Sequence, residues 1–435
     1  MRVQRDLIEK IKPFLKRKEF ISIVGPRQSG KTTFLQILND CLVKDFNINK
    51  DRIQIVTFED RKLLMQFEKD AVSFVRSYAR RGSKRKFYLM IDEFQYAKGG
   101  GQKLKLIYDT VKNIRIFITG SSSLDIKARV GKFMVGRILN FNLYPFNFRE
   151  YLRTVDDRLE RIYYQHNQEI LQWLFAGRQC KKIKKGEDIF YEELSCEYEK
   201  FCIWGGYPAV VLAKTEIERK KILSDIYNNY ILKDIKTLPE LATEKNLFLL
   251  SQYLATQIGN IVVYKNLSQA SQLDYRKLKK HLNILEETFV CKAIKPFFKN
   301  RQKELSKNPK VFFMDLGFRS NLVENMNALD KRSDAGAVIE NSVFIRLIEI
   351  CENVNKINFW RTKAGAEVDF VLHIRGDVVP VEVKYTNFTS AKISRSLGSF
   401  IDSFKPGYAI VLTKNYRASA TKNNTTVLFL PVYYL

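Results

Sequence analysis

The sequence predicts an α/β fold built on a parallel sheet, with further α/β structure towards the C-terminus. The first observation is an apolar strand that runs through a glycine-containing loop into a helix, within residues 20–38. The second is an apolar run that ends in two acids, residues 87–93, because such acids mark the carboxyl edge of a parallel sheet. The third is a pair of alternating segments within residues 367–385, which is typical of a β-hairpin.

Residues 25–32 read GPRQSGKT and match the phosphate-loop pattern G-x-x-x-x-G-K-[ST] at every defined position. In such a loop the glycines let backbone N–H groups surround phosphates, in front of a helix N-terminus. We expect Lys31 to reach the β- and γ-phosphate oxygens and the Thr32 hydroxyl to ligate Mg²⁺. The predicted ATP-contacting residues are Gly25, Pro26, Arg27, Gln28, Ser29, Gly30, Lys31, Thr32 and Thr33.

The rest of the first 152 residues continues as a P-loop NTPase parallel sheet. Strands are predicted over residues 52–58, 87–91, 114–118 and 138–141, with helices over residues 1–18 and 61–80. Asp92, at the end of the third strand, is expected to hold the Mg²⁺ shell and bind the nucleotide complex. Glu93 is expected to polarise the attacking water.

Two further residues near strand ends are candidates for the same chemistry. Ser121 follows the strand 114–118 and is predicted to sense the γ-phosphate, while an ordinary Gly-Ser turn is an equally open alternative. Arg137 precedes the strand 138–141, and an arginine at a subunit edge can stabilise charge on a transferring phosphoryl group. An ordinary surface arginine is the alternative. A role of Arg137 in a neighbour's site would require a homo-oligomer.

The order of these motifs resembles the prokaryotic ATPases of the AAA+ class that carry an uncharacterised C-terminal nuclease-like domain. Beyond the phosphate loop, the resemblance rests on residues 136–152, on WGGYP at 204–208 and on FFMDLG at 312–317. It implies an ATPase core over residues 1–152, a helical lid with a charged insertion over 153–238, a winged-helix-like module over 239–310 and a restriction-endonuclease-like domain over 311–435.

Residues 266–282 predict two short helices joined by a turn, followed by a first wing strand at residues 290–297, as in a winged helix. The predicted exposed basic face comprises Tyr275, Arg276, Lys277, Lys279 and Lys280, and the predicted wing tip comprises Lys299, Arg301, Lys303, Lys307 and Lys310. Leu278, Leu282 and Leu285 are expected to face inward. Such a surface predicts contacts with DNA phosphates, whereas a rigid connector between domains is the alternative.

In the C-terminal hairpin, a two-residue loop at Arg375 and Gly376 pairs each residue of one strand with the residue equally far from the loop on the other strand. This register sets Asp369 opposite Glu382 and Glu367 opposite Lys384. Cross-strand Cβ atoms lie about 4.5 to 5.5 Å apart, so two carboxylates can share one divalent ion. The strand faces are expected to alternate, one apolar and one largely polar.

The spacing D-x12-E-x-K of these residues resembles the PD-(D/E)xK signature of restriction endonucleases and junction resolvases. Glu340, on a helix expected over residues 335–351, matches the acidic residue on the first helix of that family. The resemblance implies that Asp369, Glu382 and Glu340 bind Mg²⁺ and that Lys384 activates water. The alternatives are a solvated sheet face and a catalytically silent domain that holds a DNA or protein partner.

Composition limits the classes of protein. A formal net charge of +27 over 435 residues favours a polyanionic partner, with DNA as the first candidate, although a generally lysine-rich composition is the alternative. Six scattered cysteines without C-x-x-C, and three histidines, indicate neither a disulfide framework nor a zinc site. No leader-like segment and no membrane-length apolar run occurs, so a cytoplasmic protein without membrane partners is expected.

Overall fold

The computed structural model divides the chain into two compact units. One comprises Met1–Phe146 with Glu287–Val290, and the other comprises Asn147–Glu286 with Cys291–Leu435. The structure describes residues 2–79, 85–121, 130–176, 190–236, 244–298 and 307–435. The predicted division into four parts is not tested by this arrangement and stays a prediction.

The first unit contains a five-stranded sheet in the order β2-β3-β4-β1-β5, and each neighbouring pair is parallel. The strands are β1 (Phe20–Val24), β2 (Ile53–Thr57), β3 (Phe87–Asp92), β4 (Ile114–Gly120) and β5 (Ile138–Asn142). This confirms the predicted parallel sheet. Because the strands are parallel, the phosphate loop after β1 and the ends of β3 and β4 meet at the same edge.

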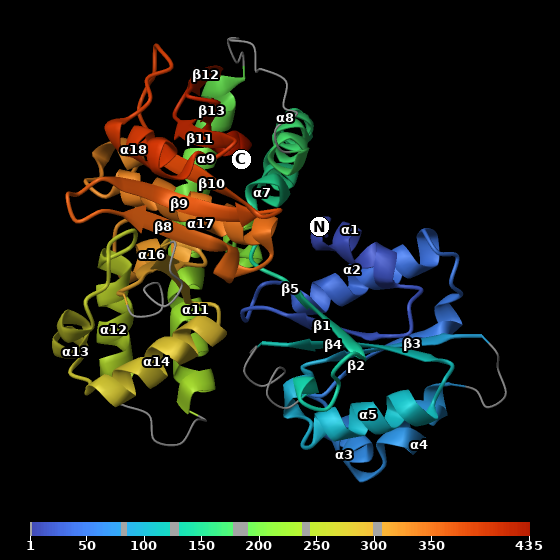
Figure 1. Ribbon diagram of the computed structural model, residues 1–435. Coiled ribbons are helices and arrows are strands. Elements are labelled where there is room, and N and C mark those ends of the chain that lie inside the picture. Colours follow the sequence, from blue (N-terminus) through green and yellow to red (C-terminus); the bar gives the residue numbers. More distant parts are fainter. Residues whose placement is uncertain (1, 80–84, 122–129, 177–189, 237–243, 299–306) are drawn as a thin grey trace. The chain divides into compact units, whose positions relative to one another are not determined.

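Helices cover both faces of this sheet. They are α1 (Leu7–Ile11), α2 (Lys31–Lys44), α3 (Arg61–Lys69), α4 (Ala71–Tyr78) and α5 (Gly100–Thr110). Figure 1 shows α1 and α2 on one face and α3, α4 and α5 on the other, and one apolar core lies on each side. The covering of both faces explains why β1 and β4 are buried along their whole length.

Two helix predictions for this unit are wrong in extent. The leader helix expected over residues 1–18 is only α1, followed by a 3₁₀ turn at Lys12–Phe14. The single helix expected over residues 61–80 is two helices, because Asp70 leaves helical geometry at the end of α3. Its carboxylate then accepts the N–H groups of Val72 and Ser73 and so caps α4.

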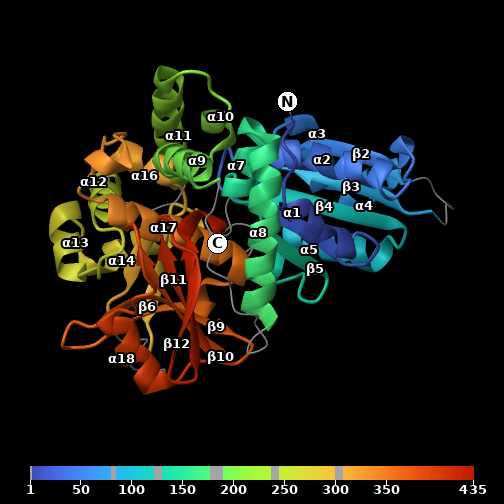
Figure 2. The same cartoon turned by 90° about the horizontal axis from the view of Figure 1, so that it is seen from above.

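The second unit has helices before its sheet in the sequence and further helices between the strands of that sheet. Its helices are α7 (Phe148–Val155), α8 (Asp157–Ala176), α9 (Tyr191–Trp204), α10 (Pro208–Val211), α11 (Glu216–Lys236), α12 (Glu244–Thr256), α13 (Tyr264–Ser271), α14 (Tyr275–Glu287), α16 (Leu316–Leu322), α17 (Ala335–Cys351) and α18 (Arg395–Phe404). Figures 1 and 2 both show α12, α13 and α14 grouped together. No helix among the described residues combines the length and apolar character needed to cross a membrane.

The structure has two short helices joined by a turn in the stretch 266–282. α13 ends at Ser271, Gln272 adopts a left-handed φ of 55°, and α14 starts after Asp274. The first helix starts two residues before the predicted stretch, so Asn266 lies inside α13. The Asp274 carboxylate accepts the N–H groups of Arg276 and Lys277, so it caps α14.

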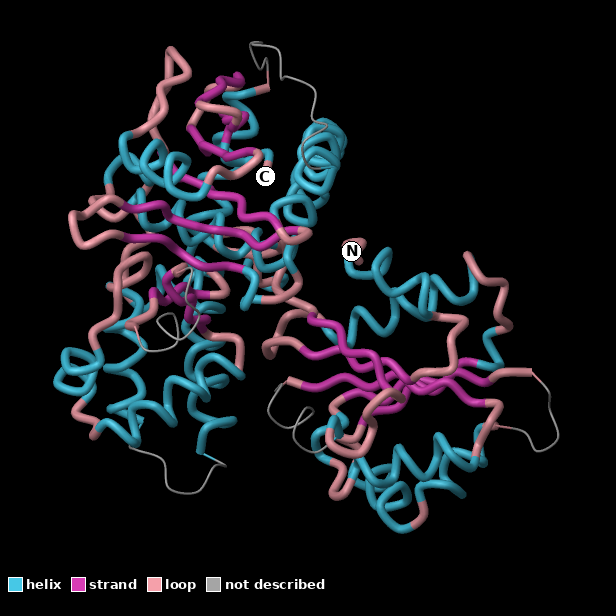
Figure 3. Tube along the Cα trace, in the orientation of Figure 1, coloured by secondary structure: helices cyan, strands magenta, loops and turns pink. Residues whose placement is uncertain are grey.

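A mixed eight-stranded sheet completes the second unit, in the order β12-β13-β11-β10-β9-β8-β6-β7. Its strands are β6 (Cys291–Pro296), β7 (Lys310–Phe313), β8 (Ile357–Arg361), β9 (Glu367–Ile374), β10 (Asp377–Lys384), β11 (Tyr408–Thr413), β12 (Ala418–Lys422) and β13 (Thr425–Pro431). The expected first wing strand is β6, but it pairs with both β7 and β8. The wing strand therefore belongs to the C-terminal sheet. Figure 3 shows the strands of both units in magenta.

The β9–β10 hairpin has the predicted two-residue loop. Arg375 and Gly376 both have positive φ, and pairing follows the predicted register from Ile374 with Asp377 to Phe370 with Val381. The observed pairs of this hairpin do not include Asp369 with Glu382 or Glu367 with Lys384. The expectation of a largely polar second face is wrong. Val371 on that face is fully buried, because the apolar side of α18 packs against it.

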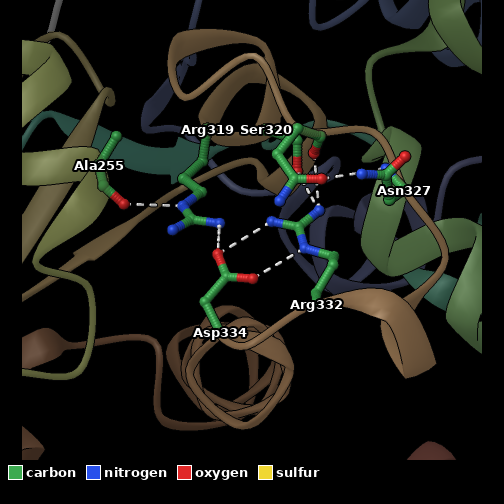
Figure 4. A network of polar contacts seen from close by, with 7 residues as sticks. Ala255, Arg319, Ser320, Asn327, Arg332 and Asp334 are labelled. Carbon is green, nitrogen blue, oxygen red and sulfur yellow. Dashed lines mark hydrogen bonds and ion pairs between the residues drawn. The ribbon is translucent and has the colours of Figure 1, made fainter.

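A polar network fixes the start of α17, the helix that carries Glu340 (Figure 4). The buried Arg319 donates to the Ala255 carbonyl at 2.8 Å and to Asp334 Oδ2 at 2.5 Å. The buried Arg332 donates to Asp334 Oδ1 at 2.8 Å. These two guanidinium groups hold the pKa of Asp334 well below its usual range. The network therefore joins α12, α16 and α17.

Candidate functional site

The phosphate loop adopts a conformation that requires its glycines. Gly30 has a φ of 89° and caps the N-terminus of α2, so the first N–H groups of that helix are directed towards the loop. A Cβ atom at Gly25 would lie 2.0 Å from the Leu143 carbonyl oxygen, which no side chain could tolerate. The backbone conformation of the loop at Gly25 and at Gly30 therefore depends on these residues having no side chain.

Lys31 is buried at the base of this loop. Its Nζ donates to the carbonyl oxygens of Gly25 at 3.0 Å and Pro26 at 2.8 Å. The ammonium group therefore lies inside the ring of loop backbone where the motif expects phosphate oxygens.

Asp92 lies between two threonine hydroxyls at the carboxyl edge of the sheet. Thr32 Oγ1 donates to Asp92 Oδ2 at 2.5 Å, and Thr119 Oγ1 donates to Asp92 Oδ1. Glu93 N–H donates to both Asp92 Oδ1, at 3.2 Å, and Thr119 Oγ1, at 3.1 Å. The structure thus brings the two predicted Mg²⁺ ligands, Thr32 and Asp92, into direct contact.

Thr119 is a site residue that the sequence reasoning did not select. It occupies the penultimate position of β4, whereas the expectation assigned the polar role to Ser121, two residues later. A hydroxyl residue directly before the strand-ending Gly120 was the available signal.

Glu93 is held by a second polar residue that was also missed, Gln95. The Gln95 side-chain amide donates to Glu93 Oε2 and, at 3.4 Å, to Ser121 Oγ. Ser121 is buried and is therefore linked through Gln95 to the predicted water-polarising carboxylate. Glu93 itself has a φ of 55°, which directs the chain away from the end of β3.

Arg137 lies away from this group of residues. It immediately precedes β5, whose first residue Ile138 pairs with Phe20, the first residue of β1. The phosphate loop follows the opposite end of β1, so the backbone of Arg137 is about 16 Å away along the strand. Its Nε lies 3.4 Å from Asp109 Oδ1. The structure does not bring Arg137 to the phosphate loop of its own chain.

Arg5 contacts the phosphate loop from the leader segment. This buried side chain donates to the Ser29 carbonyl at 2.8 Å and the Tyr144 carbonyl at 2.6 Å, and it lies over the Phe146 ring. It ties the loop to the segment that follows β5. In so basic a chain, no sequence signal distinguishes Arg5 from other arginines.

The second unit gathers charged residues around the β9–β10 hairpin. Glu382 on β10 is 2% exposed, and both of its carboxylate oxygens lie 2.8 Å from the Ser394 hydroxyl. Lys384 Nζ lies 3.2 Å from Glu382 Oε1. Asp369 Oδ2 accepts the N–H of Val383 at 2.7 Å. These contacts bring together all three residues of the D-x12-E-x-K pattern.

The expectation that Lys310 lies at an exposed wing tip is wrong. Lys310 is the first residue of β7, its side chain is 2% exposed, and its Nζ lies 3.1 Å from Glu340 Oε1 and 2.6 Å from Glu367 Oε1. Glu367 Oε2 also lies 3.5 Å from Arg361 Nη1. The residue expected opposite Glu367, Lys384, instead pairs with Glu382. Because β7 joins the C-terminal sheet, its first side chain enters this charged group.

Burial dominates the electrostatics of two carboxyls of this charged group. It raises the pKa values of Glu340 and Asp369, while the nearby Lys310 ammonium opposes the rise in both. Within the part of the chain that the structure describes, no three His, Cys, Asp or Glu side chains are grouped to hold a metal ion. Glu340, Asp369 and Glu382 are therefore not arranged as one ligand set here.

The predicted basic face on α14 is exposed to solvent. All five of its predicted members are exposed, whereas Leu278 and Leu285 are buried as expected and Leu282 is half-buried. Lys279 Nζ lies 4.6 Å from the centre of the Tyr275 ring. Of the expected wing-tip residues, Lys307 is exposed. Lys299, Arg301 and Lys303 lie outside the described residues.

Comparison with known proteins finds matches along most of the chain. A family model described as an AAA domain matches residues 17–152. Two models described as domains of unknown function, DUF8612 and DUF4143, match residues 196–329 and 335–433. An uncharacterized protein of Haemophilus influenzae is 24% identical over 425 residues, which cover 95% of this chain and 94% of that protein. Uncharacterized protein MJ1637 of Methanocaldococcus jannaschii is 25% identical over 378 residues, 84% of this chain and 76% of that one.

Two similar solved structures are distant from this chain in sequence. The Aeropyrum pernix ORC1 protein in complex with DNA is 14% identical with a TM-score of 0.28, over 73% of this chain and 90% of that one. The Aeropyrum pernix ORC2 protein in its ADP form is 14% identical with a TM-score of 0.34, over 67% and 87%. Such scores do not bear on function. The AAA-domain match, the parallel sheet and the phosphate-loop geometry together support the P-loop AAA+ class for the N-terminal part of this chain.

Proposed function

We propose that this protein binds and hydrolyses ATP at the loop 25–32. The observation that carries the proposal is the contact of Thr32 and Thr119 with the two oxygens of Asp92, directly beside the buried Lys31. Oxygen ligands of this kind suit Mg²⁺, which supplies charge neutralisation to the phosphates when it is bound. The residues present therefore fit a Mg²⁺–nucleotide complex held by Thr32 and Asp92.

In this proposal each remaining residue has a separate task. The α2 N-terminus and the loop N–H groups bind the phosphates, and Lys31 exchanges its carbonyl partners for phosphate oxygens. Glu93 orients and polarises the attacking water, while Gln95 and Ser121 hold its carboxylate in position. Arg137 lies too far from this loop to act on it, so a role in hydrolysis places it in the site of a second copy.

Nucleotide binding and hydrolysis by single variants test the proposal. Lys31→Ala is expected to lose both ATP binding and hydrolysis. Glu93→Gln is expected to keep ATP binding while hydrolysis falls by about 100-fold or more, because only the general base is lost. Lys44→Ala, an exposed lysine at the far end of the same helix, is the matched control. Hydrolysis at the wild-type rate in Glu93→Gln would remove that residue from the mechanism.

We further propose that the protein acts on DNA through α14. The observation that favours this is the exposed basic face of that helix in a chain of net charge +27. The triple variant Arg276→Ala/Lys277→Ala/Lys280→Ala is expected to weaken binding to a labelled duplex by about tenfold or more and to flatten its salt dependence. The charge-matched control is Lys214→Ala/Lys220→Ala/Lys221→Ala, on an exposed part of the same unit. Equal effects of the two triples would favour the rigid-connector alternative.

For the C-terminal charged group, a nuclease and a catalytically silent domain are the two candidate functions. The ion pair of Lys310 with Glu340 favours the silent domain, because it engages one of the three carboxylates that a metal would need. Cleavage of linear, branched and single-stranded DNA in Mg²⁺ or Mn²⁺, with and without ATP, separates the two. We expect wild type to show no cleavage that depends on Glu382, so Glu382→Ala should give the same result as wild type. Cleavage lost in Glu382→Ala would establish the nuclease, and its loss in Lys31→Ala would show dependence on ATP.

A further inference from the structure

The charged group of the second unit contains a buried lysine, Lys310, that is not part of the D-x12-E-x-K pattern. The group comprises the carboxyls of Glu340, Glu367, Asp369 and Glu382 and the ammonium groups of Lys310 and Lys384. Lys384 belongs to the D-x12-E-x-K pattern, but Lys310 comes from β7, outside it.

The position of Lys310 is fixed by its backbone and by its side chain. β7 pairs with β6 on one side, and on the other the Val262 N–H donates to the Pro309 carbonyl at 2.8 Å. The buried ammonium lies between Glu340 and Glu367, which come from different elements, and 5.4 Å from the centre of the Phe359 ring. A lysine buried this deeply is stable only when its charge is neutralised, so these two carboxylates are committed to it.

The other carboxylates are also engaged. The Ser394 hydroxyl contacts both oxygens of Glu382, and Lys384 approaches the same group. The Val383 N–H is bonded to Asp369. A divalent cation entering the group would meet the fixed positive charge of Lys310 and would have to displace these partners.

We propose that the Lys310 ammonium is the resident cation of this carboxylate group and occupies the role that a divalent metal would have in an active nuclease of this pattern. Its removal frees Glu340 and Glu367 to rearrange with the other carboxylates into a divalent-metal site. The proposal rests on the catalytically silent alternative above, but it is tested by metal binding alone, without DNA or ATP.

The test measures Mn²⁺ binding to the full chain by calorimetry and by thermal shift. In wild type we expect no Mn²⁺ binding at this group, so Asp369→Asn should bind as much Mn²⁺ as wild type does. In Lys310→Met we expect one new Mn²⁺ site, at least about tenfold tighter than any binding at this group in wild type, because the competing charge is gone. This site should disappear in Lys310→Met/Asp369→Asn, and Mn²⁺ should raise the melting temperature of Lys310→Met. Lys307→Met, an exposed lysine three positions away, is the control.

Wild-type Mn²⁺ binding that is lost in Asp369→Asn would overturn the proposal, whatever the cleavage assay gives. A folded Lys310→Met variant that gains no Mn²⁺ site would overturn it as well. If Lys310→Met does not fold, the comparison of wild type with Asp369→Asn still decides the outcome. Cleavage by wild type that is lost in Glu382→Ala would contradict the silent domain and this proposal with it. Mn²⁺ binding of that kind without cleavage would overturn the role of Lys310 alone, so the two failures are distinguishable.

Discussion

Asp315 is a single buried residue that links two motifs lying far apart in the sequence. Its buried carboxylate accepts the N–H of Gly206 at 2.7 Å and of Phe318 at 2.8 Å. A Cβ atom at Gly317 would lie 1.9 Å from the Trp204 carbonyl oxygen, so only glycine allows this approach. The WGGYP and FFMDLG segments are therefore two halves of one structural contact, between the end of α9 and the start of α16.

The same residue makes stability depend on pH. Burial raises the pKa of Asp315 to about 6, although the backbone N–H donors oppose the rise. The folded state therefore binds more protons than the unfolded state between about pH 4 and pH 6. The contribution of this carboxyl to stability is present below the unfolded pKa and is lost as pH rises through about 6.

We expect Asp315→Asn to remove this pH-dependent term. Between pH 4 and pH 7 the free energy of unfolding of the second unit should change less with pH in the variant, by up to about 3 kcal/mol. Urea unfolding monitored at several pH values measures the difference, with Asp330→Asn, an exposed aspartate, as control. Parallel pH profiles for wild type and Asp315→Asn would contradict the assignment.

Arg5 carries a second prediction at the residue scale, for nucleotide affinity. Its bond to the Ser29 carbonyl positions the phosphate loop. Removing a charged hydrogen bond of this kind costs about 1.5 to 3 kcal/mol, part of which should appear as weaker binding. We expect Arg5→Ala to weaken ATP binding about tenfold and Arg5→Lys to restore part of it. Arg2→Ala, an exposed neighbour, is the control, and an unchanged Kd in Arg5→Ala would assign Arg5 a purely structural role.

At the scale of elements, the Asp334 network holds α12, α16 and α17 together (Figure 4). Both arginines are buried, so loss of the single carboxylate leaves two guanidinium groups without their shared partner. We expect Asp334→Ala to lower the free energy of unfolding of the second unit by about 3 to 5 kcal/mol. Chemical denaturation measures it, with Asp330→Ala as control. A loss similar to that of the control would show that water replaces the carboxylate at little cost.

At the scale of the whole molecule, the location of Arg137 predicts cooperation between copies of the chain. It lies at the opposite end of β1 from the phosphate loop and is partly exposed. We expect Arg137→Ala and Lys31→Ala each to hydrolyse ATP poorly and their mixture to hydrolyse it faster than the sum of the two. Such complementation requires one intact site made from both copies. Arg76→Ala, an exposed arginine of the same unit, is the control. Simple additivity in the mixture would exclude a role for Arg137 in a neighbour's site.

Local sequence pattern was sufficient to predict the strands of the first unit. Its central strands β1, β3 and β4 are apolar runs that are buried almost throughout, and its motifs lie at strand ends. Strand positions and the shared edge could therefore be predicted from short segments. The hairpin register at Arg375 and Gly376 was equally accessible, because a two-residue loop determines pairing. Asp70 shows the limit: a single capping residue divides a continuous helical pattern.

By itself the sequence determined the phosphate loop, the acids after β3, the exposed basic face of α14 and the hairpin register. Only the tertiary structure decided which distant groups meet. It placed Thr119 on Asp92 and Lys310 between Glu340 and Glu367, and it left Arg137 at the far edge of the sheet. The physical reason is that periodicity and turn chemistry act over a few neighbouring residues. The partner of a buried charge is chosen by strand order and by the cost of leaving that charge unpaired.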